Sequence, residues 1–98
     1  MFAILWRYRV APGAEARFRE IYGLEGDWAR LFRRAGGFVR TELLDAGEGV
    51  FASLDYWESE ADFEAFQAAF GDAYQALDAE CEALTLHEER LGLFSVVG

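Results

Sequence analysis

The order of hydrophobic periodicities along the chain restricts its fold more than any other feature. Residues 2–10 alternate with period two, as a half-buried strand does. Residues 18–32 instead carry apolar side chains at helical spacing, interrupted by glycines, so they predict two helical segments joined by a kink. The pattern further predicts strands at 38–45 and 50–57, a helix after residue 59 that is divided at Gly71 and Asp72, and a strand at 86–97.

Turn and cap residues support these boundaries. Pro12 and Gly13 end the first strand, because proline cannot donate to a ladder and glycine frees the backbone. The run 46–49 contains two glycines that suit the positive-φ positions of a hairpin. Ser59 resembles a helix N-cap, with Asp62 three residues later in a variant of the capping box.

The predicted order of strand, helix, strand, strand, helix, strand favours an α+β fold. We expect it to form one domain that spans residues 1–98. Such chains usually form a ferredoxin-like, four-stranded antiparallel sheet with both helices on one face. Apolar residues occupy both phases of several strands, so the uncovered face needs a lid, and a second copy would provide it. We therefore expect a homodimer. The charged positions expected to pair across strands or across the interface are Arg7, Arg9, Arg40, Glu42, Glu88 and Arg90.

Charge and composition restrict the binding partners and the cellular compartment that we expect for this chain. The formal net charge of −9 over 98 residues repels phosphate backbones and anionic lipid surfaces, so nucleic acid and membrane are not expected partners. Cys81 is the only cysteine, which excludes an intramolecular disulfide and suits a reducing, cytoplasmic location. We expect it to be a small buried apolar residue. The nine Phe, four Tyr and three Trp exceed what one thin core layer absorbs.

Two segments resemble the antibiotic biosynthesis monooxygenase (ABM) family, whose members form dimeric α/β barrels. One is Trp6 to Val10 followed by Pro12 and Gly13, and the other is Tyr56 to Ser59 running into Phe63. The resemblance covers nearly the whole chain. It implies a homodimer with a small aromatic-lined pocket and, in its cofactor-free members, a monooxygenase that acts on phenolic or quinol substrates without any cofactor. In such chemistry the deprotonated substrate itself passes an electron to dioxygen, so the protein supplies dry aromatic walls and polar groups near the phenolate.

The candidate site residues lie around Trp57. The resemblance implies Trp57, Ser53 and Phe63, and Asp55 is added because it lies two residues before Trp57 on the same strand face. The candidate catalytic residues are Asp55, Ser53 and Trp57. The candidate ligand-binding residues are Phe63, Phe66, Tyr74 and Trp6. Ser53 stands where cofactor-free members have Asn and can still donate a hydrogen bond, whereas Phe63 replaces a Tyr and cannot.

Each candidate also has a purely structural interpretation. Trp57 could be a core anchor, and Trp6 could pack in the core or the interface. Asp55 could pair across strands with Arg7 or Arg40. His87 is predicted on the last strand, where a solvated or dimer-contact role is more common than proton transfer.

Two other functions remain open. A non-catalytic module that binds a small hydrophobic aromatic ligand, or that only builds an oligomer, is the main alternative. The haem-degrading branch of the family is disfavoured, because Gln67 occupies the position of its axial His and the chain contains no Asn. The acidic run from Glu58 to Glu64 scatters its carboxylates around a helix start and predicts no metal site.

Overall fold

The computed structural model describes all 98 residues. Its elements are β1 (Phe2–Val10), α1 (Glu15–Tyr22), α2 (Asp27–Arg33), β2 (Phe38–Gly47), β3 (Val50–Trp57), α3 (Glu60–Cys81), a short 3₁₀ turn (Glu82–Leu84) and β4 (Thr85–Ser95). No helix is long and apolar enough to span a bilayer.

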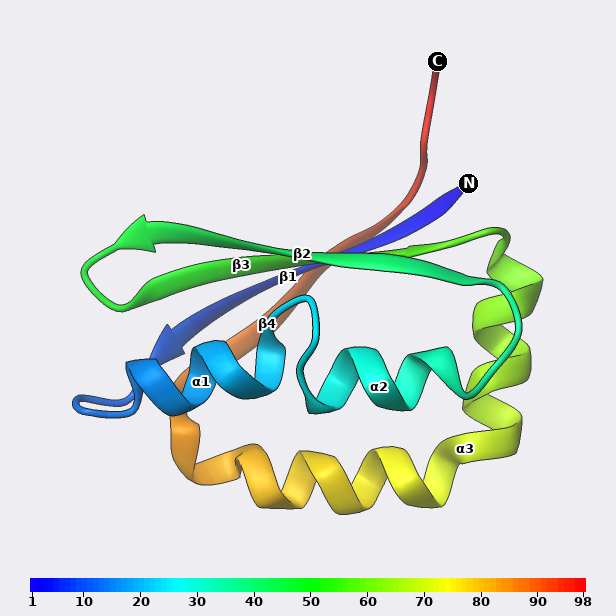
Figure 1. Ribbon diagram of the computed structural model, residues 1–98. Helices are drawn as coiled ribbons and strands as arrows, with labels where there is room; N and C mark the ends of the chain where they lie inside the picture. Colours follow the sequence, from blue (N-terminus) through cyan, green and yellow to red (C-terminus); the bar gives the residue numbers. More distant parts are fainter.

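The strands form one antiparallel sheet in the order β2-β3-β1-β4, and all the helices lie on one side of it (Figure 1). This arrangement confirms the ferredoxin-like α+β prediction. In Figure 1 the second half of α3 lies farther from the sheet than α1 and α2 do. The helices and the sheet therefore enclose an interior that side chains from several elements can reach.

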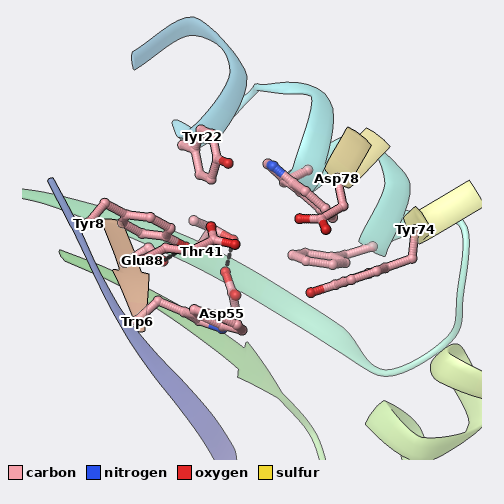
Figure 2. A pocket seen from close by; sticks show the side chains of 11 residues that line it. Trp6, Tyr8, Tyr22, Thr41, Asp55, Tyr74, Asp78 and Glu88 are labelled. Atoms are coloured by element: carbon pink, nitrogen blue, oxygen red, sulfur yellow. Dashed lines mark hydrogen bonds between the residues drawn. The ribbon is translucent and has the colours of Figure 1, made fainter. Parts of the chain in front are cut away.

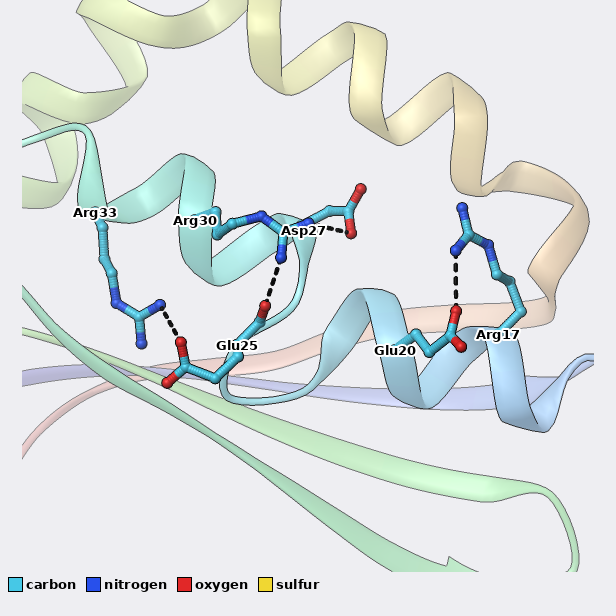
Figure 3. A network of polar contacts seen from close by, with 6 residues as sticks. All are labelled: Arg17, Glu20, Glu25, Asp27, Arg30 and Arg33. Carbon is cyan, nitrogen blue, oxygen red and sulfur yellow. Dashed lines mark hydrogen bonds and ion pairs between the residues drawn. The ribbon is translucent and has the colours of Figure 1, made fainter.

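The break between α1 and α2 depends on a glycine and two arginines. A Cβ on Gly26 would lie 2.3 Å from the carbonyl oxygen of Ile21, so the backbones approach too closely for any other residue. Arg30 donates to the carbonyl of Glu25 at 2.7 Å (Figure 3). Arg33 donates to the carbonyl of Leu24 at 3.0 Å. These bonds satisfy carbonyls that the interrupted helix leaves free.

Two element boundaries differ from the sequence prediction. Helix α3 bends at Phe70, with φ −121° and ψ 21°, one residue before the predicted break at Gly71 and Asp72. The last strand is Thr85–Ser95 rather than 86–97. The hairpin turn is as expected, with positive φ at Gly47, Glu48 and Gly49, and the N-cap is present because Ser59 Oγ accepts from the Asp62 amide at 3.1 Å.

The two faces of the sheet differ in chemistry. The face toward the helices carries the mixed phase of β3, in which Phe51, Ser53, Asp55 and Trp57 are all buried. The aromatic core is continuous there, for example through Phe18, whose ring lies 5.1 Å from that of Phe51.

The opposite, open face is apolar at its centre and charged at its margins. Strand register places Leu5 beside Leu54, and Leu44 and Phe94 on the same face are each 48% exposed. Arg7 pairs there with Glu89 across strands, and Arg40 pairs with Glu42 at 3.5 Å along β2. The expected partners Arg9, Glu88 and Arg90 form no ion pair in the structure.

Candidate active site

A cavity lies between the sheet and the helices. The sheet contributes Trp6, Tyr8, Thr41, Ser53, Asp55 and Glu88 to its lining, and the helices contribute Tyr22, Trp28, Phe32, Tyr74 and Asp78. Its volume is about 40 Å³, which is room for a few water molecules. Figure 2 shows the labelled side chains converging on this space from β1, the β2–β3 pair, β4 and the helices.

Asp55 is the most deeply buried carboxyl group in the cavity lining. It is 8% exposed, and its Oδ1 accepts a hydrogen bond from Thr41 Oγ1 at 2.7 Å (Figure 2). Loss of hydration disfavours the charged form, and this effect outweighs the Thr41 bond, raising the pKa of Asp55 to about 6. Asp55 is therefore an ionisable group that can exchange a proton near neutral pH.

The expected pairing of Asp55 with Arg7 or Arg40 is wrong. Both arginines project from the opposite face of the sheet, because β1 and β2 alternate their side chains and Asp55 lies on the helix side. Thr41, directly across β2 from Asp55, takes the place of the cation.

Besides Thr41, the hydroxyl groups of Tyr8, Tyr22, Ser53 and Tyr74 add polar character to the aromatic walls. Tyr8 Oη and Ser53 Oγ are 3.0 Å apart in a buried hydrogen bond. Burial raises the pKa of Tyr8 well above its ordinary value. Burial and the carboxylates of Asp78, Glu88 and Asp55 raise the pKa of Tyr74 to about 12. Both tyrosines are hydrogen-bond donors at neutral pH.

Four of the seven predicted site residues line this cavity. Asp55, Ser53, Trp6 and Tyr74 come together there, although they lie on three different elements. Their catalytic and binding roles stay predictions.

Trp57, Phe63 and Phe66 lie outside the cavity lining. Trp57 has no exposed surface, and its ring packs within 5.6 Å of the rings of Phe32, Phe63 and Phe66. Because Phe32 is itself a cavity wall, Trp57 supports that wall from behind, which is the core-anchor arrangement.

The sequence prediction missed several lining residues. Thr41 could have been found by counting register back from the hairpin, and Tyr8 by its two-residue spacing from Trp6. Tyr22, Trp28 and Phe32 looked like ordinary core residues, and no signal distinguished Asp78 or Glu88 from surface acids.

His87 and Cys81 take no direct part in the cavity. His87 lies opposite Arg9 on the open face. Cys81 is 2% exposed, as expected of a small buried residue, and burial raises the pKa of its thiol.

A four-stranded antiparallel sheet with its helices on one side and an aromatic cavity between the layers defines a ferredoxin-like α+β protein with an internal candidate site. The family model described as antibiotic biosynthesis monooxygenase matches residues 1–79. The chain belongs to the ABM family. Among curated protein sequences, none matches it.

Several solved structures share the fold. SnoaB, a cofactor-independent oxygenase from Streptomyces nogalater, is 26% identical, with a TM-score of 0.74 over 99% of this chain and 93% of SnoaB. The monooxygenase of the ActVA-Orf6 gene of Streptomyces coelicolor, in complex with nanaomycin D, is 17% identical, with a TM-score of 0.75 over 99% of this chain and 88% of that one. Rv0793 from Mycobacterium tuberculosis is 15% identical, with a TM-score of 0.71 over 99% of this chain and 95% of its own.

Proposed function

We propose that this protein is a cofactor-independent monooxygenase that oxidises a small phenolic or quinol ring in the cavity, with Asp55 as the base. The observation that carries the proposal is a buried carboxyl group at the wall of an aromatic cavity, held by Thr41 through one oxygen. The similarity to SnoaB, a cofactor-independent oxygenase, supports the same class of reaction.

The proton transfer is energetically reasonable. A phenol titrates near pH 10, so transfer to a carboxylate whose pKa is about 6 is uphill by about 4 units, or about 5 kcal/mol. A cost of that size fits within ordinary enzymatic barriers. The hydroxyl groups of Tyr74 and Ser53 are available to donate to the phenolate oxygen and to lower this cost further.

The oxidation then needs only the ring and dioxygen. The phenolate passes one electron to dioxygen, which leaves a phenoxyl radical and superoxide. In a ring that carries hydrogen on the carbon opposite the oxygen, these join at that carbon, and the peroxide takes up the proton held by Asp55. Loss of water from the hydroperoxide breaks the O–O bond and the C–H bond of that carbon. The balance is phenol plus dioxygen to para-quinone plus water.

A ring enters this cavity only if some walls move. A volume of about 40 Å³ is smaller than a phenol ring requires. Trp6 and Tyr74 are only half-buried, in contrast to the sealed core around Trp57, so they are the walls that can turn outward at least cost.

Oxygen uptake tests the proposal directly. Purified protein is given anthrones, quinols and catechols, with a chelator present and no flavin, and the product is analysed after reaction with isotopically labelled dioxygen. We expect uptake with one labelled oxygen atom in the quinone product and the other in water. Asp55→Asn should lose this activity, whereas Glu80→Gln, an exposed change on α3 away from the cavity, should keep it.

The alternative function gives a different result in the same experiment. A non-catalytic module would bind these rings, as shown by calorimetry, without consuming dioxygen. That outcome would overturn the monooxygenase proposal and retain the cavity as a binding site.

We also propose that the protein acts as a homodimer through the open face of the sheet. Leu44 and Phe94 are half-exposed there, and Leu5 and Leu54 lie between them on the neighbouring strands. Covering such a face with an identical sheet removes apolar surface from water on both copies at once.

A further inference from the structure

The charged side chains that line the cavity are all acidic. Asp55, Asp78 and Glu88 line it, and no Lys, Arg or His does. Asp78 and Glu88 are close enough that Asp78, together with burial, raises the pKa of Glu88. Two basic side chains lie near the cavity without lining it: His87 acts on Glu88, and Arg90 acts on Tyr74. An anionic group that entered would meet repulsion from at least two elements.

The remaining walls suit a cation as well. Six aromatic side chains line the cavity, namely Trp6, Tyr8, Tyr22, Trp28, Phe32 and Tyr74. The faces of aromatic rings attract cationic groups, and this attraction grows when water is excluded.

A second observation at the same cavity points to a ligand. Trp28 is 7% exposed and lines the cavity, yet its indole Nε1 has no hydrogen-bond partner. Tyr22 and Cys81 lie close enough to interact with Trp28, but neither is placed with the geometry of a hydrogen bond to Nε1. A buried donor without a partner is costly, and an acceptor atom on a bound ligand would relieve that cost.

We infer that the cavity selects hydroxylated aromatic rings that carry an amine side chain and rejects those that carry a carboxylate, with Asp78 and Glu88 as the residues that discriminate. The inference rests on the proposed function, since it assumes that a phenolic ring occupies the cavity. Beyond the proposed function, the inference specifies the charge of the side chain that the phenolic ring carries.

Three matched phenols test this selectivity by titration calorimetry at neutral pH and low salt: tyramine with an ammonium group, para-ethylphenol without charge, and para-hydroxyphenylpropionate with a carboxylate. We expect tyramine to bind roughly tenfold more tightly than para-ethylphenol, and the propionate roughly tenfold more weakly, as two nearby carboxylates at intermediate dielectric would produce. The double variant Asp78→Asn, Glu88→Gln should lose most of this preference and keep only the part due to Asp55, which also lines the cavity. Glu80→Gln, on the same helix but away from the cavity, should keep the full preference.

The outcomes separate this inference from the proposed function. Binding of para-ethylphenol with no charge preference, or with a preference for the propionate, would overturn the selectivity and leave the phenol site standing. A preference that is undiminished in the double variant would also overturn it, because Asp78 and Glu88 would not be its cause. Failure of all three phenols to bind would overturn both.

Discussion

At the scale of single residues, Asp55 combines a proposed catalytic role with a cost in stability. Its carboxyl group titrates near 3.8 when solvated and near 6 in the fold. Because the folded pKa is raised, the protein is most stable below the solvated value and loses stability as pH rises through 6. The loss is about 3 kcal/mol, from about 2 pKa units at 1.36 kcal/mol each.

Asp55→Asn should therefore stabilise the protein at neutral pH, by up to about 3 kcal/mol, and have little effect near pH 3. The amide keeps the acceptor for Thr41 and cannot ionise. Urea unfolding at several pH values measures this difference in the free energy of unfolding. Asp45→Asn should instead lower the stability at neutral pH, because hydrogen bonds from the Gly47 amide and Arg19 lower the pKa of Asp45. A stability difference for Asp55→Asn that does not change with pH would contradict this account.

Substitutions of Trp57 and Trp6 should have different effects, one mainly on stability and the other mainly on ligand binding. Trp57→Ala removes a fully buried ring from the core and should cost about 3–5 kcal/mol of unfolding free energy. Trp6→Ala removes a half-buried cavity wall and should cost less stability while weakening the binding of para-ethylphenol. Denaturant titration and calorimetry on both variants check this. Unchanged stability of Trp57→Ala would show that Trp57 is not the core anchor described above.

At the scale of elements, the break between α1 and α2 places Tyr22 at the end of one helix and Trp28 at the start of the next, both against the cavity. Gly26→Ala should destabilise the protein by about 1–3 kcal/mol, since its Cβ would lie 2.5 Å or less from the carbonyl oxygens of Glu20 and Ile21. Gly36→Ala is the matched control, because its Cβ would have no neighbour within 4 Å. Thermal unfolding of both variants measures the difference, and equal midpoints would contradict the steric argument.

The elements were predictable because each has a local cause. Period-two alternation, the glycine-rich hairpin and the Ser59 cap all act within a few residues, and each is present in the structure. The bend at Phe70 was displaced by one residue from the glycine that suggested it. Glycine permits a break, but packing decides which residue adopts the non-helical angles.

The site was less predictable, because it depends on contacts between distant segments. Asp55, Ser53, Trp6 and Tyr74 were identified in advance, partly from the family resemblance. Asp78 and Glu88 were not, since only the path of α3 and β4 brings them to the same cavity. Trp57 was expected in the cavity because of the family resemblance, but the rings of α2 and α3 enclose it.

At the scale of the whole molecule, the open face of the sheet should decide the assembly. Light scattering during size-exclusion chromatography should give twice the chain mass of 11.1 kDa. Leu54→Lys, at the centre of the open face, should give single chains, because two lysines would be buried against each other. Leu24→Lys, at a residue 58% exposed in the α1–α2 loop, should not change the mass. A wild-type protein of single-chain mass would contradict the homodimer.

The central claim for the molecule is that Asp55, in its ionised form, takes the proton of a phenol held in the cavity. The pH dependence of kcat/KM for oxygen uptake measures it most directly, with a neutral phenol so that Asp78 and Glu88 act on an uncharged ligand. We expect the rate to rise through the pKa of Asp55, about 6, and to reach a plateau below the titration of Tyr74 at about 12. Asp55→Asn should lack activity at every pH. A variant that keeps the wild-type rate and profile would contradict the account.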